Sequence, residues 1–308
     1  MGLEVLSAGL QSTVQDQGRF GYTHLGVSAS GAADSFAFRI GNMLVGNPKH
    51  AAGIEMTIVG DKYRFQSDAY IALTGSEFEA ELDNKPIPFW QGRSIKKEQI
   101  LDIRSTKTGA RCYLCITGGI NVEDVMGAKT THLTSGMGGF HGRILKKLDE
   151  LNFGKLDDSI KPIQKLNESI TTDNKIIRVT KGTQWVWFHK NQKNKFFQHQ
   201  YRVTDLSNRM GLRLIGNAIN TKKESEITTA GIPLGAIQIP GDGQPIISFV
   251  EHQTTGGYPI IANVISADLR KIGQLKPEDC FQFELISFGA AEKLKVDQEI
   301  FLHSLHYD

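Results

Sequence analysis

The densest group of side chains suited to chemistry lies in two neighbouring stretches, 235–247 and 251–259. Their amide, hydroxyl and phenol groups belong to Gln238, Gln244, Gln253, Thr254 and Tyr258. Glycines beside them let a ligand approach the main chain and leave N–H groups available, and Gln, Thr and Tyr supply neutral hydrogen-bonding groups. This mixture suits a small amide or carboxylate better than a bare phosphate. Two hairpins with ordinary turn residues remain the alternative interpretation.

A second candidate group lies near the N-terminus. Arg19 precedes a stretch of small residues, 28–34, that leads into a predicted helix. The first turn of a helix has free N–H groups that attract anions, and Arg19 could add a bidentate contact to a carboxylate or phosphate. The alternative, an Asp16–Arg19 ion pair beside an ordinary capped helix, is the one that the sequence on its own favours.

Several familiar catalytic and nucleotide-binding motifs are missing. Residues 135–143 are rich in glycine but lack the spacing G-x-G-x-x-G, and the chain has no Walker-type Gly-Lys-[Ser/Thr] at this loop, so we interpret it as an ordinary loop. The histidines form no H-E-x-x-H motif and no serine stands in G-x-S-x-G. We therefore predict no metal site and no ready-made catalytic triad.

Cys112 and Cys115 have the C-x-x-C spacing of metal and redox sites. Because the surrounding residues, 111–116, are predicted to form a buried strand, side chains three positions apart should point to opposite faces. We therefore expect the two sulfurs to diverge. The whole chain has only three cysteines, which also fits a reducing compartment.

The elements that must position these groups are mostly short strands. Frequent glycines between short apolar or alternating runs are typical of strands joined by tight turns. Strands are predicted at 53–60, 70–74, 78–82, 100–103, 112–116, 185–188, 235–239, 246–250 and 281–285. Apolar spacing with terminating Gly or Pro predicts helices at 33–44, 267–275 and 290–305. The sequence thus predicts a β-rich protein, mainly β with minor α, with Trp185 and Trp187 in its core.

Length and polar stretches indicate two domains. A chain of 308 residues is long enough for two, and the polar residues 148–176 suggest a connection or a long surface excursion. We predict domains at 1–150 and 151–308, with 151–176 as the polar connection, and a surface loop at 189–200. A weak echo between residues 16–26 and 205–216 suggests two related lobes with one arginine each, and a cleft between lobes would suit a ligand.

Charge and hydropathy exclude several classes of function. The chain has 35 Lys and Arg against 33 Asp and Glu, a net charge of +2, which argues against a protein that binds nucleic acid by neutralising phosphates. No apolar run approaches the roughly 18 residues that a membrane span needs, and the N-terminus does not look like a signal peptide. We therefore expect a cytoplasmic protein that binds neither nucleic acid nor membranes.

Motifs spread along the chain resemble a known family. They are Thr13–Gly21, Ser30–Asp34, Asn42–Asn47, Glu55-x-Thr57, Tyr113–Ile120, Asn208–Leu214, Gly235–Pro240, Gly243–Ile246 and the distinctive Gln253-Thr254-Thr255-Gly256-Gly257-Tyr258-Pro259. In this order they resemble the carboxyltransferase subdomain A and B family. That family includes the C subunit of prokaryotic 5-oxoprolinase, also called KipA or allophanate hydrolase subunit 2. Glu251-His252 stands where the pattern has Asp followed by a variable residue.

The resemblance implies two cyclophilin-like β-barrel lobes and a component of an ATP-dependent 5-oxoprolinase. Such a complex opens 5-oxoproline to glutamate, with two sister subunits, a B type (KipI-like) and an A type (LamB/YcsF-like), and with ATP and Mg bound in the complex. Within this chain, Asp34 and Glu55 are candidate general acids or bases and Tyr258 a catalytic hydrogen-bond donor. Candidate substrate contacts are Arg19, Arg209, Gln238, Gln244, Gln253 and Thr254.

Two other functions remain open from the same resemblance. The chain could be the carboxyltransferase component of a biotin-dependent urea carboxylase-type enzyme, whose site would also favour amides and which would need a biotin carrier among its partners. It could also act without catalysis, as an antagonist that sequesters a KipI-type kinase inhibitor.

Overall fold

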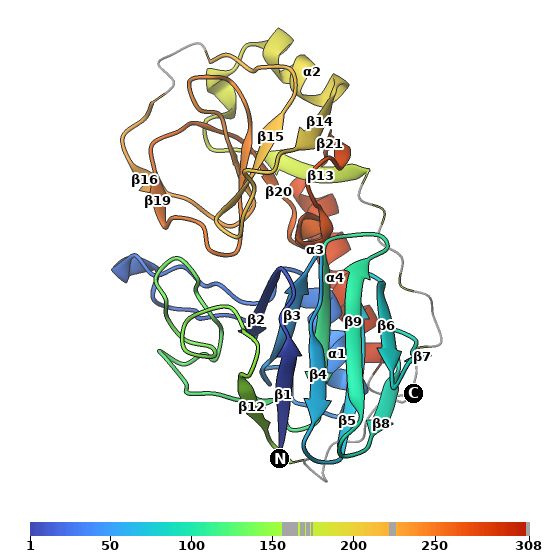
Figure 1. The fold of residues 1–308 in the computed structure, drawn as a ribbon. Helices are drawn as coiled ribbons and strands as arrows, with labels where there is room; N and C mark the ends of the chain where they lie inside the picture. Colours follow the sequence, from blue (N-terminus) through green and yellow to red (C-terminus); the bar gives the residue numbers. More distant parts are fainter. Residues whose placement is uncertain (156–165, 167–169, 171–172, 174, 222–225, 306–308) are drawn as a thin grey trace. The chain divides into compact units, whose positions relative to one another are not determined.

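The computed structural model describes residues 1–155, 166, 170, 173, 175–221 and 226–305. It divides the chain into two compact units (Figure 1). Unit 1 comprises Met1–Arg19, Ser30–Ile170 and Leu302–Asp308, and unit 2 comprises Phe20–Ala29 and Thr171–Phe301. Most of the predicted connection, 151–176, lies outside the described residues. Its first residues, however, belong to strand β12, which pairs with β1 in unit 1.

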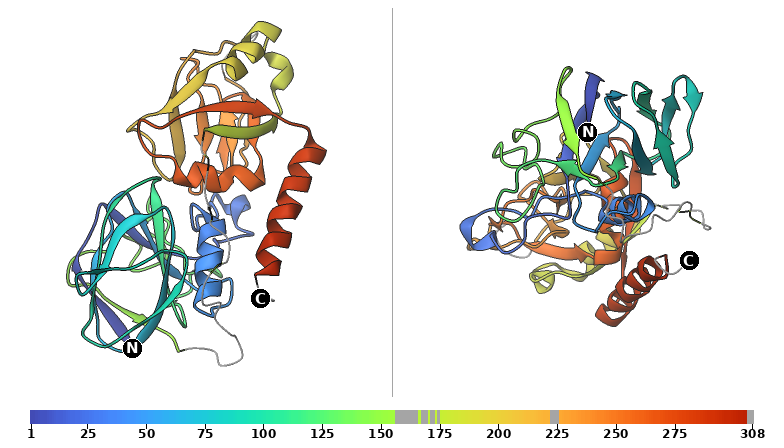
Figure 2. Two further views of the ribbon diagram at one scale, coloured as in Figure 1. Left: turned by 90° about the vertical axis from the view of Figure 1, so that its right-hand side faces the viewer. Right: turned by 90° about the horizontal axis from the view of Figure 1, so that it is seen from below.

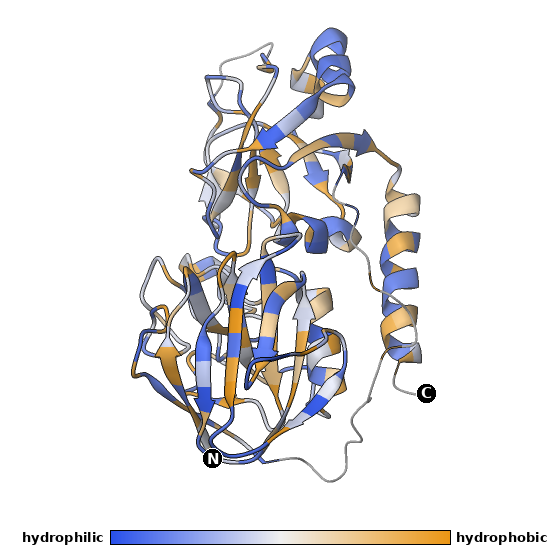
Figure 3. Ribbon diagram, turned by 45° about the vertical axis from the view of Figure 1, so that its right-hand side comes forward, coloured by the Kyte–Doolittle hydropathy of each residue, from blue (hydrophilic) through white to orange (hydrophobic). Residues whose placement is uncertain are grey.

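Unit 1 is built from two β-sheets. The larger has the order β11-β12-β1-β4-β9-β6-β7 and the smaller β2-β3-β10-β5-β8. Their bounds are β1 Gly2–Ser7, β2 Gln11–Gln15, β3 Gly53–Thr57, β4 Lys62–Phe65, β5 Ala69–Gly75, β6 Phe78–Leu82, β7 Lys85–Pro86, β8 Gly92–Ile95, β9 Ile100–Thr106, β10 Arg111–Ile116, β11 Ile120–Asn121 and β12 Glu150–Phe153. Strands such as β6 alternate apolar and polar residues (Figure 3), so one face of each is buried in the core between the sheets.

Strand β10 is covered on both faces and is buried along its whole length. Cys112 faces the core between the sheets, whereas Cys115 faces helix α1 (Ser35–Leu44) and its Sγ lies 3.8 Å from the carbonyl oxygen of Phe38. The expected divergence of the two sulfurs is confirmed. Helix α1 lies against the outside of β5 and β10 (Figure 2).

Unit 2 contains a closed barrel with the order β13-β20-β17-β18-β15-β14-β21. All its pairs are antiparallel except β13 with β21. Bounds are β13 Ile176–Lys181, β14 Gln200–Val203, β15 Gly211–Ile215, β17 Ala236–Gln238, β18 Ile246–Ser248, β20 Ile260–Val264 and β21 Cys280–Leu285. Strands β16 Ala230–Gly231 and β19 Thr255–Gly256 form a separate two-stranded ribbon. The helices of unit 2 include α2 Lys190–Gln198, α3 Leu269–Gln274 and α4 Phe288–Ser304. Helix α4 ends in residues assigned to unit 1. Short 3-10 helices are η1 Thr23–Leu25, η2 Trp185–Trp187 and η3 Ser266–Asp268.

The β-rich architecture confirms the predicted fold class, but two local predictions are wrong. Trp185–Trp187 form a 3-10 turn instead of a core strand, and Val186 is largely exposed. The predicted loop 189–200 contains α2, because Phe196 is fully buried and stacks on Phe283 with ring centroids 4.6 Å apart. Tertiary packing thus stabilises a helix whose composition is polar.

No described helix combines the length and apolarity that crossing a bilayer requires.

Asn47 connects the end of α1 to β10. Its Nδ2 donates to Asn42 Oδ1 at 3.0 Å and to the carbonyl oxygen of Ile116 at 2.8 Å, and its Oδ1 accepts from the Gly118 amide at 2.7 Å. The side chain is buried, so few water molecules can replace these partners.

We expect Asn47→Ala to lower the free energy of unfolding by about 2–3 kcal/mol, because it leaves main-chain groups unpaired. Chemical denaturation measures the effect. Asn152→Ala, at an exposed position of β12, is the matched control and should change stability by less than about 0.5 kcal/mol. Equal effects of the two substitutions would contradict a connecting role for Asn47.

Candidate functional site

The two candidate acidic residues of unit 1, Asp34 and Glu55, both contact one tyrosine, Tyr113. Glu55 on β3 accepts hydrogen bonds from the Tyr113 hydroxyl at 2.9 Å and from the Ala33 amide at 2.7 Å. The Tyr113 hydroxyl in turn accepts from the Asp34 amide at 2.7 Å. Tyr113 and Glu55 are direct partners in the β3–β10 ladder, so the sheet register itself brings these groups together.

Both carboxylates also have structural roles. The Asp34 side chain caps α1 by accepting from the Ala37 amide at 3.0 Å, and such a cap stabilises a helix by about 1 kcal/mol. Glu55 lies beside Arg111, with Oε1 3.7 Å from Nε. Both carboxylates are almost completely buried. Burial, followed by the charges of Glu55 and Asp34, raises the pKa of Tyr113 well above its usual value, so its hydroxyl stays protonated.

Arg19 is also buried in unit 1. Its Nε donates to the carbonyl oxygen of Val125 at 2.8 Å and its Nη2 to that of Thr130 at 3.2 Å. A side chain at Gly138 would come within 2.7 Å of Nη2, so the glycine-rich stretch 135–143 approaches the guanidinium closely. Arg19 therefore holds the loop containing residues 125–130. The Asp16 carboxylate holds the same loop, because it accepts from the amides of Gly18 and Lys129. The Asp16–Arg19 ion pair stays a prediction.

Arg209 occupies a comparable buried position in unit 2. Its Nε lies 2.5 Å from Glu251 Oε1, and the Glu251 amide donates to the Arg209 carbonyl oxygen at 2.8 Å. Both side chains are buried. The pair joins the turn before β15 to the segment that follows β18. Glu251 stands where the family pattern has Asp, and the longer carboxylate still reaches the guanidinium.

Gln238, at the end of β17, has a side-chain nitrogen without a hydrogen-bond partner among the described residues. The residue is more than nine-tenths buried, and among the described residues no acceptor lies within hydrogen-bonding distance of its Nε2. A Cβ on Gly256 would approach this nitrogen to 3.0 Å. The β16–β19 ribbon (Figure 1) thus covers the amide with glycine backbone. A buried donor without a partner costs about 1–3 kcal/mol, which a ligand oxygen could offset.

Gln253, Thr254 and Tyr258 flank β19, the strand that contains Gly256, in the chain. Gln253 is exposed, Thr254 is half-buried, and Tyr258 is 39% exposed. The Thr254 carbonyl oxygen accepts from the Ile232 amide, which fixes the segment beside the ribbon. Next to them, burial lowers the pKa of His252, so its ring stays neutral at neutral pH. The polar side chains of this segment are therefore neutral, and its Gly256 backbone is the part that lies close to the Gln238 amide.

Gln244 is engaged by a neighbouring turn. Its Oε1 accepts from the Gly216 amide at 2.9 Å and its Nε2 donates to the Gly216 carbonyl oxygen at 3.2 Å. The structure thus brings Asp34 and Glu55 together in unit 1, and Gln238 and the 253–258 segment together in unit 2. Convergence of all the candidate residues on one groove stays a prediction.

Sequence reasoning misses two residues that complete these clusters, Tyr113 and Glu251. The sequence indicates Tyr113 only as part of a strand, although a tyrosine on a strand buried on both faces needs a partner for its hydroxyl. Glu251 stands out only as a departure from the family pattern. The requirement that a buried arginine have a carboxylate partner could have identified it.

Comparison with known proteins adds independent evidence. Residues 25–285 match the family described as carboxyltransferase domain, subdomain A and B. The 5-oxoprolinase C subunit of Escherichia coli is 35% identical over 305 residues, covering 98% of this chain and 97% of that protein. The urea amidolyase of Lachancea kluyveri is 33% identical over 98% of this chain but only 18% of its own length. The crystal structure of Kluyveromyces lactis urea carboxylase superposes with a TM-score of 0.93 and 32% identity, covering 99% of this chain and 29% of that one.

We expect Glu251→Ala to lower the free energy of unfolding by about 3–5 kcal/mol, because Arg209 then keeps a buried charge without its carboxylate. Glu278→Ala is the matched control. It removes an exposed carboxylate 2.5 Å from Arg202, and exposed pairs contribute at most about 1 kcal/mol. Denaturant titration of both variants compares the two losses. A loss at Glu251 no larger than the loss at Glu278 would refute the buried-pair interpretation.

Proposed function

We propose, from the premise that this chain belongs to the carboxyltransferase subdomain A and B family, that it is the C subunit of an ATP-dependent 5-oxoprolinase. The observation that carries the proposal is the alignment with the Escherichia coli protein over nearly the full length of both chains. The unpaired Gln238 amide supports it from the structure, because a lactam oxygen would supply the missing acceptor.

The proposed reaction opens the lactam of 5-oxoproline. A water oxygen joins the carbonyl carbon and the ring C–N bond breaks, which leaves the second carboxylate and the free amine of glutamate. An amide is a poor electrophile, so ATP would activate its oxygen. A donor placed at that oxygen stabilises the negative charge that develops there.

In this proposal Gln238 donates from Nε2 to the lactam oxygen. Gln253 and Thr254 orient the substrate and Tyr258 donates a further hydrogen bond, since these polar side chains follow β18 beside the ribbon and are at least partly accessible. We assign Arg19 and Arg209 a positioning role, because protein atoms bind their guanidinium groups. Asp34 and Glu55 position α1 through Tyr113.

In this proposal the chain works in a cytoplasmic complex with two sister subunits, one KipI-like and one LamB/YcsF-like. The complex binds ATP with Mg. Among the described residues no three His, Cys, Asp or Glu side chains converge on a point that could hold a metal ion. In this proposal the chain binds and orients the amide.

A carboxyltransferase acting on a urea-type amide is the second candidate. The superposition with urea carboxylase over the whole chain favours it, and urea presents a carbonyl oxygen like that of a lactam. This function would need a biotin carboxylase and a biotin carrier among the partners. This function is the second choice, because the chain covers only 18% of the urea amidolyase and 29% of the urea carboxylase.

Purification of the chain with its associated polypeptides tests the two functions. Sister subunits and ATP-dependent glutamate formation from 5-oxoproline would support the first. Biotinylated partners and carboxylation of urea would support the second. A complex that forms with the sister subunits but turns over neither substrate would contradict both, and would favour a regulatory binding protein.

We expect Gln238→Met to raise the KM for the amide substrate about tenfold or more. A change of this size corresponds to the loss of one hydrogen bond to a buried partner. The same variant should be at least as stable as the parent chain, because it removes a buried unpaired donor. Steady-state kinetics of the complex and thermal melting of the chain measure the two effects.

Gln244→Met is the matched comparison, because its amide is satisfied by Gly216. That variant should melt at a lower temperature than the parent chain. Loss of stability in Gln238→Met, together with an unchanged KM, would overturn the role that we give to Gln238.

A further inference from the structure

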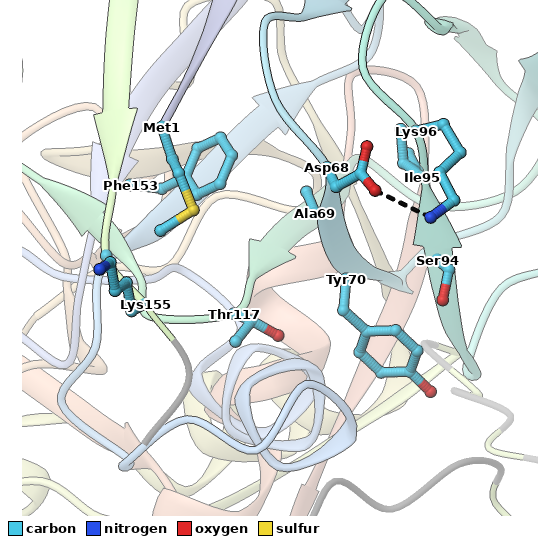
Figure 4. A pocket seen from close by; sticks show the side chains of 11 residues that line it. Met1, Asp68, Ala69, Tyr70, Ser94, Ile95, Lys96, Thr117, Phe153 and Lys155 are labelled. Atoms are coloured by element: carbon cyan, nitrogen blue, oxygen red, sulfur yellow. Dashed lines mark hydrogen bonds and ion pairs between the residues drawn. The ribbon is translucent and has the colours of Figure 1, made fainter. Parts of the chain in front are cut away.

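Unit 1 contains a cavity that none of the candidate site residues lines. Its volume is about 590 Å³, within the range of about 300–1,000 Å³ typical of small-molecule sites. Figure 4 shows Met1, Phe153 and Lys155 on one side and Ser94, Ile95 and Lys96 on the other. All the lining residues belong to unit 1.

The cavity lies where the ends of the two sheets separate. Met1 precedes β1 and Phe153 ends β12, both in the larger sheet, whereas Tyr70 on β5 and Ile95 on β8 belong to the smaller sheet. Gly154 packs directly against the backbone of Gly118, where any side chain would overlap. The Gly154 and Gly118 backbones therefore pack closely beside the cavity without adding a side chain to its lining.

The walls combine an apolar surface with a positive rim. Phe153, Ile95 and the ring of Tyr70 supply apolar contacts. Burial raises the pKa of Tyr70, so its hydroxyl remains neutral. Such walls suit an apolar body that is removed from water.

The charges at the rim do not cancel. Asp68 accepts from Lys96 Nζ at 2.8 Å and from the Lys97 amide at 2.9 Å. The hydrogen bond from Lys96 lowers the pKa of Asp68, which therefore stays ionised and neutralises that lysine. The exposed Lys155 is the second cation of the lining. The charged side chains of the lining, two lysines and one aspartate, sum to +1 (2 − 1), and a positive rim favours an anionic group on a ligand.

We propose that this cavity binds a small amphipathic monoanion, an apolar chain or ring that carries one carboxylate or sulfonate group. The apolar body occupies the space between the sheet ends, and the anionic group lies at the rim near Lys155, because Asp68 already neutralises Lys96. This site is separate from the residues proposed to bind the amide, and it does not depend on the proposed function.

Fluorescence titration of the full-length chain with 1-anilinonaphthalene-8-sulfonate tests the proposal, because this probe has an apolar body and one sulfonate. We expect saturable binding at one site. Decanoate should displace the probe at a concentration about tenfold lower than decanol requires, because decanol lacks the charge.

Two substitutions locate the binding site. Ser94→Trp, at an exposed position of β8 that lines the cavity, should weaken probe binding about tenfold by filling the space. Lys155→Glu should weaken probe binding about threefold to fivefold, as expected for an exposed charge. This loss of affinity should be smaller at high salt, which screens the charge. Lys85→Glu makes the same change in net charge at an exposed position of β7 away from the cavity, and should leave binding unchanged.

Melting temperatures of the three variants show whether each remains folded. Unsaturable probe binding, or equal affinity of the parent chain, Ser94→Trp and Lys155→Glu, would overturn the proposed site. Equal displacement by decanol and decanoate would overturn the anionic ligand. Neither result would affect the 5-oxoprolinase proposal, which is tested by turnover in the complex.

Discussion

A polar group buried in this chain is stable only where another segment supplies its hydrogen-bond partner, and this requirement shapes both units. In unit 1 the Tyr113 hydroxyl joins β10 to β3 through Glu55 and to the start of α1 through Asp34. In unit 2 the Arg209–Glu251 pair joins two segments that flank the barrel. A buried group that loses its partner costs more than the hydrogen bond contributes, so each of these contacts fixes the path of two chain segments.

This requirement separates the structural polar residues from those available to a ligand. Asp34, Glu55 and Arg19 have acidic and basic side chains that suggest chemistry, yet protein groups occupy them. Gln238 is neutral and less conspicuous, but it is the buried amide whose nitrogen lacks a partner among the described residues. Glycine at position 256 lets the backbone approach this nitrogen closely, because a Cβ there would lie 3.0 Å from it. The proposed binding role of Gln238 therefore rests on this unpaired nitrogen and not on residue type.

The two candidate ligand sites differ in the physical basis of recognition. At the proposed Gln238 site, a buried neutral amide beside the β16–β19 ribbon favours a ligand that supplies a hydrogen-bond acceptor. At the cavity of unit 1, apolar walls and a charge of +1 favour an amphipathic anion. One depends on the direction of hydrogen bonds, the other on burial of apolar area and on charge, so a single ligand would not suit both.

The sequence by itself determined the β-rich class, eight of the twenty-one described strands, helix α1 and the divergence of Cys112 and Cys115, because these follow from the period of apolar residues along the chain. Its motifs also identified the family, since they occur in order over most of the length. Only the tertiary structure decided that 190–198 is a helix, since Phe196 packs on a strand more than eighty residues away. The same holds for the partners of Tyr113, Arg209 and Gln238. Periodicity reports which face of an element is buried, whereas the identity of the group across that face depends on strand register and loop path, which local sequence does not encode.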